Sequence, residues 1–215
     1  MGGALILASV CVYLPAVFIR HHNGVTLSVQ TSVTGLLLYF SFILTGYHTS
    51  FKGDGIDKVI FLFLCGFCLM FFLLDVSNKW LPIEFTLPFC LLGLFIHIHD
   101  GNTQASITAL LSMLAFLLLL RCALNKVYHA ESLGKGDVWL VAGIAAWSGF
   151  IYAAAVMAAS LFTLLMVCAL KPLFYKSQAS SFYNEQVTFP LAPAICGFFI
   201  VTTVFNVPFI SNLAF

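Results

Sequence analysis

The sequence predicts an all-α protein that crosses a membrane about eight times, and three observations support this prediction. First, 61% of the residues are hydrophobic, only 8% are charged, and the mean hydropathy is +1.05, whereas a soluble domain carries about 25% charged residues. Second, the apolar residues form long uninterrupted runs. Third, most of the Lys and Arg residues follow alternate runs. Because a soluble fold of this length could not bury so much apolar surface, lipid must cover the rest.

The apolar runs define the predicted helices. They cover residues 3–20, 28–47, 58–75, 84–98, 104–122, 137–150, 151–171 and 187–207. Backbone groups in lipid must be paired within their own segment, which predicts helices, and the runs lack the alternation of a membrane barrel. The boundary near residue 150, between the sixth and seventh runs, leaves two alternatives. Both spans within 137–171 are short for a hydrocarbon core of about 30 Å. Either Ser148 and Gly149 form a tight hairpin, or residue 137 lies below the membrane surface.

The positive charges predict the orientation of these helices. Seven of the nine Lys and Arg residues follow odd-numbered runs: Arg20, Lys79, Arg121, Lys126, Lys135, Lys171 and Lys176. The other two, Lys52 and Lys58, follow the second run. Because loops rich in Lys and Arg stay in the cytoplasm, we expect odd-numbered runs to end at the cytoplasmic face and both termini to lie outside.

Several classes of ligand are excluded by the composition. A net charge of +1 does not provide the basic patch that nucleic acid requires. A zinc site needs four ligands, and the Cys65 and Cys68 pair has no second pair of matching spacing. We therefore expect no nucleic-acid partner and no metal. The N-terminus lacks a basic segment and a signal cleavage site, so the first run is predicted to be a retained span.

Two of the eight acidic residues lie where carboxylates are costly. Asp75 ends the third run and Asp137 opens the sixth, so both are expected at cytoplasmic helix ends and at one depth. Ionisable residues at the edge of hydrocarbon are functional candidates, and two carboxyl groups that approach closely can share a proton. One would act as a base toward water and the other as an acid toward a peptide carbonyl. Alternatively, each faces interfacial water, with Asp137 serving as a helix cap.

Glycines flank the second carboxylate in the string Gly134-Lys135-Gly136-Asp137. Glycine permits positive φ and lets the backbone approach another chain closely, and a peptidase must hold an extended substrate strand against its own backbone. We therefore predict that Gly134 and Gly136 support the substrate strand. Lys79 and Glu131 are expected near the two carboxylates, as candidates to orient the substrate or tune a carboxyl group.

Three stretches of the chain carry a family resemblance. Residues 131–149 (ESLGKGDVWLVAGIAAWSG) resemble E-G-M-G-x-G-D-x-K-L-x-A-x-x-G-A-W-x-G. Residues 75–93 contain DVSNKWLP, then FTLP and LG, which resemble D-x-x-x-x-x-L-P, L-T-L-P and L-G-L. Residues 189–193 (FPLAP) are similar to a late P-F-G-P segment. In this order and spacing they resemble the type IV prepilin leader peptidases, which are bacterial GxGD membrane aspartic peptidases, and the resemblance is strongest over residues 75–207.

The resemblance implies a function as well as a fold. Asp75 and Asp137 would be the catalytic pair of an aspartic endopeptidase with a water nucleophile and no metal or organic cofactor. Residues 1–215 would form a single transmembrane peptidase domain in the bacterial inner membrane, with its active site facing the cytoplasm. Its partners would be membrane lipid and a prepilin or pseudopilin of a type IV pilus or type II secretion system, whose short basic leader it cleaves before the apolar segment. The resemblance indicates no oligomeric state.

Two departures from the family pattern bear on the expected function, and Ser132, which stands in place of a Gly, is a mild third one. Many members carry a cytoplasmic insert after the first span, with paired C-x-x-C zinc motifs linked to N-methylation of the new terminus. Here that loop is only Arg20–Gly24, so we expect no N-methyltransferase activity, unless another protein fills the role of the insert. The Lys that usually follows the second aspartate by two positions is Trp139 here.

Two other classes of function are alternatives to the peptidase. A transporter could use Asp75 and Asp137 as a proton relay, but it predicts aspartates near the middle of the membrane and inverted repeats, and no clear repeat is present. A non-catalytic pilus or secretion assembly factor could keep the fold. Loss of an aspartate would indicate that case, and both aspartates are present.

Overall fold

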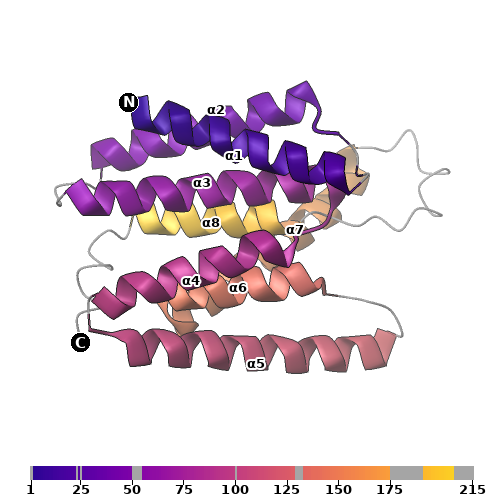
Figure 1. The fold of residues 1–215 in the computed structure, drawn as a ribbon. Coiled ribbons are helices and arrows are strands. Elements are labelled where there is room, and N and C mark those ends of the chain that lie inside the picture. Colours follow the sequence, from indigo (N-terminus) through magenta and orange to yellow (C-terminus); the bar gives the residue numbers. More distant parts are fainter. Residues whose placement is uncertain are drawn as a thin grey trace.

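The computed structural model describes residues 2–22, 24, 26–49, 55–99, 101–128, 133–174 and 191–205. Eight helices account for nearly all of these described residues, and no strand occurs among them. The helices are α1 (Gly2–His21), α2 (Val29–Thr49), α3 (Gly55–Asn78), α4 (Ile83–His99), α5 (Thr103–Tyr128), α6 (Lys135–Ser148), α7 (Phe150–Phe174) and α8 (Ala192–Phe205) (Figure 1). The predicted all-α class and the eight predicted helices are confirmed.

The helices differ in whether they could cross a bilayer unaided. Five of those described are long and apolar enough to do so, namely α1, α2, α3, α5 and α7. The others are shorter, with 17 residues in α4 and 14 in each of α6 and α8. At a rise of about 1.5 Å per residue, α6 is about 21 Å long, less than the roughly 30 Å of a hydrocarbon core. The chain is thus a multi-pass helical membrane protein in which the helix that carries Asp137 is a short one.

A single residue, Gly149, separates α6 from α7. Its φ is 88°, and its N–H donates a hydrogen bond to the Ala145 carbonyl at 2.8 Å. A positive φ at the end of a helix favours glycine, because other residues meet a Cβ clash there. Of the two alternatives that the sequence left open, the tight turn at Ser148 and Gly149 is therefore present. The depth of residue 137 in the bilayer stays a prediction.

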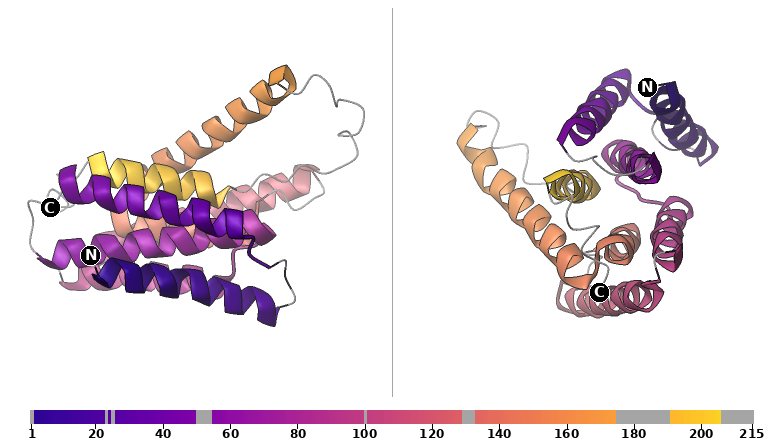
Figure 2. Two further views of the ribbon diagram at one scale, coloured as in Figure 1. Left: turned by 90° about the horizontal axis from the view of Figure 1, so that it is seen from above. Right: turned by 90° about the vertical axis from the view of Figure 1, so that its left-hand side faces the viewer.

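The helices pack in two groups, one around α3 and one around α6. The first group is α1, α2, α3 and α8, and the second is α4, α5, α6 and α7. The view along the bundle in Figure 2 shows α3, α6 and α8 inside, with α1, α2, α5 and α7 toward the outside. In the apolar segment of α3, 61% of the residues are buried, whereas in that of α5 only 11% are buried. Because α8 contacts α3, α6 and α7, it joins the group that carries Asp75 to the group that carries Asp137.

The C-terminal end of α6 is fixed by α4 and α5. Trp147 Nε1 donates a hydrogen bond to the Phe89 carbonyl at 3.0 Å, and Ser106 Oγ donates one to the Ala146 carbonyl at 2.6 Å. The indole also fills the space beside Gly93, where a Cβ atom would lie 2.7 Å from Trp147 Cδ1. Small residues allow such close helix packing in membranes. Gly93 and Trp147 belong to the two long stretches that carry the family resemblance, so these stretches are in direct contact.

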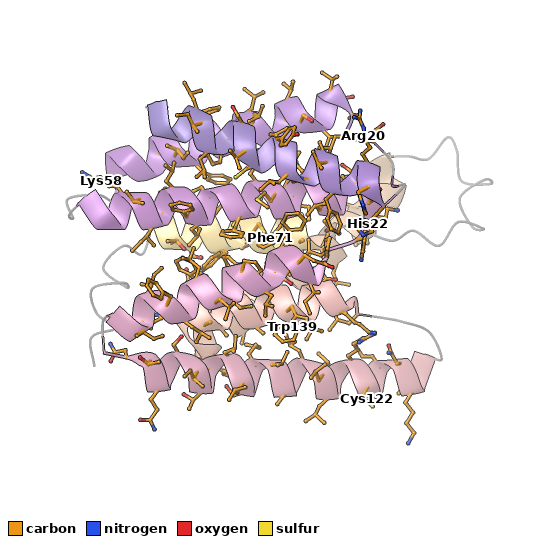
Figure 3. The ribbon with its side chains drawn as sticks, in the orientation of Figure 1. Arg20, His22, Lys58, Phe71, Cys122 and Trp139 are labelled. Carbon is orange, nitrogen blue, oxygen red and sulfur yellow. The ribbon has the colours of Figure 1, made fainter. Side chains whose placement is uncertain are left out.

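The two ends of the bundle carry positive residues that the sequence assigns to opposite faces of the membrane. Arg20 and His22 lie at one end and Lys58 lies at the opposite end (Figure 3). This separation agrees with the sequence-based assignment of Arg20 and Lys58 to opposite faces of the membrane. The face that meets the cytoplasm stays a prediction.

Candidate active site

Asp75 lies in the last turn of α3, with its side chain only 6% exposed. Its Oδ2 accepts a hydrogen bond from the backbone N–H of Ala192 at 2.9 Å. Ala192 is the first residue of α8, and the first N–H groups of a helix have no acceptor within the helix. The Asp75 carboxylate therefore accepts a hydrogen bond from an otherwise unpaired donor, and its negative charge is stabilised by the positive end of the α8 dipole.

Asp137 lies in the first turn of α6 and is half-buried. Its carboxylate turns back toward the preceding loop, since a Cβ atom at Gly134 would lie 2.9 Å from Asp137 Oδ2. A glycine at position 134 thus leaves room for the carboxylate in this position. A larger residue there would require the carboxylate to move.

The structure brings Asp75 and Asp137 into one site. The charge of Asp75 acts on Asp137, although the two residues come from different helix groups. Cys196 of α8 is buried next to Cys68, close enough to both carboxylates for their charges to act on its thiol. Two carboxyl groups and a largely apolar surround form the arrangement in which one proton can be shared.

Gly136 makes the closest approach between α6 and the segment that follows Asp75. A Cβ atom at Gly136 would overlap the Leu81 carbonyl oxygen and Cβ, so the close contact made by this glycine is with the chain's own α3–α4 connection. Leu81 is buried, and the contact fixes the start of α6 against the end of α3. The predicted support of a substrate strand by Gly134 and Gly136 stays a prediction.

Lys79 is the first residue after α3 and has the left-handed backbone conformation, with a φ of 51°. Its N–H donates a hydrogen bond to the Asp75 carbonyl at 2.8 Å, and its positive charge acts on the Asp75 carboxylate. Lys79 is therefore near one of the two carboxylates, as the sequence predicted, and its orienting role stays a prediction. Glu131, the other candidate for that role, lies outside the described residues.

Trp139 is half-buried on α6, two positions after Asp137 (Figure 3). Its carbonyl accepts a hydrogen bond from Cys90 Sγ at 3.4 Å, which adds to the contact between α6 and α4. Across the described part of the chain, no three His, Cys, Asp or Glu side chains are grouped so that they could hold a metal ion. Among the described residues, the polar groups at the site include the two carboxylates, the Ala192 N–H, the Lys79 ammonium and the Cys68 and Cys196 thiols.

Two contacts of this site were not predicted from the sequence. Ala192 and Leu81 act through backbone atoms, so their side chains carry no sign of the role. The available signal was indirect, because Ala192 lies in the FPLAP run and Leu81 lies in the DVSNKWLP run. Both runs belong to the family resemblance.

Comparison with known proteins identifies one family. A sequence model of the type IV leader peptidase family matches residues 62–171, just over half of the chain. The match includes both aspartates and the glycine string before Asp137, and it ends before α8. No curated protein and no solved structure matched the chain.

Proposed function

This chain belongs to the type IV leader peptidase family, a family of proteases, and we propose that it is an aspartic endopeptidase with Asp75 and Asp137 as its catalytic carboxylates. Its substrates would be type IV prepilins or pseudopilin-like proteins, from which it removes the short basic leader. One observation carries the proposal. Asp75, which is buried, and Asp137, which is half-buried, are 62 positions apart in the sequence but lie close enough for the charge of one to act on the other.

The proposed chemistry needs one carboxylate and one carboxylic acid. The carboxylate takes a proton from a water molecule, whose oxygen attacks the carbonyl carbon of the scissile peptide bond. The carboxylic acid gives its proton to the carbonyl oxygen, which yields a tetrahedral gem-diol. The C–N bond then breaks as the first carboxyl group gives the proton that it took from water to the leaving amine, and the second carboxylate regains a proton from the gem-diol. No covalent bond forms between enzyme and substrate. Gly136 and Leu81 would hold the two aspartates in register by fixing the start of α6 against the end of α3.

The position of the two aspartates supports a substrate with a basic leader and an apolar segment. Asp75 lies at the end of α3 and Asp137 at the start of α6, so both belong to the same end of the bundle. The distribution of Lys and Arg predicts that this end faces the cytoplasm, and the family resemblance implies a bacterial inner membrane. A peptide cut there would keep its leader in the cytoplasm and its apolar segment in the bilayer.

We propose further that residues 1–215 act as one peptidase domain without N-methyltransferase activity. The α1–α2 connection covers only residues 22–28. A segment of that length has no room for the cytoplasmic insert with paired zinc motifs found in many members of the family. A cleaved product without an added methyl group would support this part of the proposal.

Co-expression with a prepilin tests the function. Leader removal is followed by gel shift and by mass spectrometry of the product. We expect cleavage by the wild-type chain and none by Asp75→Asn or Asp137→Asn, each at wild-type level in the membrane. The matched control is Asp57→Asn, because Asp57 is at the opposite end of α3 from Asp75 and its variant should cleave normally. Cleavage by either active-site variant would refute the proposed pair.

A further inference from the structure

A cavity of about 150 Å³ lies between α2, α3 and α8. Residues from all three helices line it, and none of the described lining residues is charged. Among the described lining residues, Tyr39 brings the only hydroxyl group, which donates a hydrogen bond to the Ala4 carbonyl at 3.4 Å. The cavity is therefore an apolar space without charge.

One end of the cavity adjoins the two carboxylates. Phe72 precedes Asp75 by one helical turn on α3, and Pro193 follows Ala192, whose N–H binds Asp75. Cys196 lines the cavity and lies close enough to Asp75 and Asp137 for their charges to act on its thiol. The cavity thus adjoins the candidate active site, although neither aspartate is among its lining residues.

From that end the cavity continues into the bundle. Its lining passes from Phe72 back to Cys65 on α3, and from Pro193 forward to Ile200 on α8. Each of these stretches is about 10 Å long at the rise of a helix. On α2 the lining extends from Gly35 to Phe42, in the same direction, because the α1–α2 connection adjoins the end of α3. A Cβ atom at Gly24 would lie 2.8 Å from Asn78 Oδ1.

We propose that this cavity is the subsite for one apolar side chain of the substrate's membrane segment. The inference rests on the proposed function and adds the place where that segment is recognised. A substrate cut at the two carboxylates must continue from them into hydrocarbon, and the cavity continues from them in that direction. Its uncharged lining suits the apolar side of the scissile bond, while the acidic end suits the basic leader. An apolar cavity of about 150 Å³ holds a benzene-sized group, so it takes one side chain up to the size of a phenyl ring.

Gly197 provides the test of this subsite. It lines the cavity, and a Cβ atom built on it meets no atom within 4 Å, so a side chain at this position enters open space. Replacing it by Ala, Val and Leu should fill the cavity in steps. Because one methylene group in an apolar pocket changes specificity by roughly 10-fold or more, we expect kcat/KM for a prepilin to fall about 10-fold or more with Gly197→Leu, and less with Gly197→Ala. The matched control is Gly3→Leu, since a Cβ atom at Gly3 also meets nothing within 4 Å and Gly3 is not among the residues that line the cavity.

A substrate series identifies the side chain that enters the cavity. Apolar residues in the first two turns of the prepilin segment are replaced by Ala, one at a time, and each substrate is offered to the wild type and to Gly197→Leu. We expect one replacement to restore cleavage by Gly197→Leu to within about threefold of the wild type, which also shows that the variant is folded. If Gly197→Leu does not accumulate in the membrane, the graded loss is measured with Gly197→Ala and Gly197→Val.

The outcomes separate this inference from the proposed function. Cleavage by the wild type, unchanged in all three Gly197 variants, would overturn the subsite and leave the peptidase intact; this is the result expected if only lipid chains fill the cavity. A loss that no substrate replacement restores would equally overturn it, because the loss would then be one of packing. Absence of cleavage by the wild type would overturn the proposed function and the subsite with it.

Discussion

The carboxylate of Asp75 accepts a hydrogen bond from the backbone N–H of Ala192 at 2.9 Å, and so joins two helices whose contacting residues are 117 positions apart. This bond connects the end of α3 to the start of α8, the helix that contacts both helix groups. The placement of Asp75 relative to Asp137 therefore depends on a donor that belongs to the backbone of a third helix.

Removing that donor should weaken catalysis without unfolding the protein. Proline at the first position of a helix lacks the N–H and is well tolerated there, so Ala192→Pro deletes the bond to Asp75 selectively. A hydrogen bond to a charged group contributes about 1.5–3 kcal/mol, and we expect kcat/KM for a prepilin to fall roughly 10-fold to 100-fold. Ala192→Gly keeps the N–H and serves as the control. Equal cleavage by Ala192→Pro and Ala192→Gly would show that the bond does not position Asp75.

The contact between Gly136 and Leu81 predicts a difference between the two glycines before Asp137. A Cβ at position 136 overlaps backbone, whereas a Cβ at position 134 meets only the Asp137 carboxylate, at 2.9 Å. Overpacking of this kind costs about 1–3 kcal/mol. We expect Gly136→Ala to lower the thermal unfolding temperature in detergent and to reduce cleavage. Gly134→Ala should reduce cleavage with little change in stability.

Gly3→Ala is the control for both glycine variants, because a Cβ at that position meets no atom within 4 Å. A Gly136→Ala protein as stable as Gly3→Ala would contradict the close approach to Leu81.

Trp147 is expected to stabilise the helix that carries Asp137 without taking part in the chemistry. Trp147→Phe deletes the indole N–H that binds the Phe89 carbonyl at 3.0 Å, and leaves a buried acceptor unpaired. The expected loss is about 1–3 kcal/mol of stability, measured by thermal unfolding in detergent, with the pH dependence of kcat unchanged. A variant as stable as the wild type but with an altered pH profile would mean that Trp147 acts on the carboxylates themselves.

The sequence predicted much of the fold because the membrane restricts the possibilities so strongly. Each uninterrupted apolar run had to be a helix, and the eight runs correspond to the eight helices of the described residues. The region around Gly149 could not be settled, because a tight turn and a dipped Asp137 fit the same short spans. The choice depended on the φ of a single glycine, 88°, which hydropathy does not encode.

The sequence predicted the two carboxylate side chains of the candidate site but not its backbone contacts. Asp75 and Asp137 stood out because carboxylates are costly at the edge of hydrocarbon. Ala192 and Leu81 contribute backbone atoms, which any residue can supply, so nothing in their side chains indicated them. The glycine string indicated a close backbone approach, but the sequence could not show that the partner of Gly136 is the chain's own Leu81 carbonyl.

The most direct test of the proposed pair is a comparison of single and double variants. Purified wild type, Asp75→Asn, Asp137→Asn and the double variant are placed in lipid nanodiscs, and initial rates of prepilin cleavage are measured. Residues that act as one unit lose activity non-additively. We expect each single variant to be slower by at least about a thousandfold and the double variant to be no slower than either. Substantial cleavage by one single variant, or losses that multiply in the double variant, would contradict a shared catalytic role for Asp75 and Asp137.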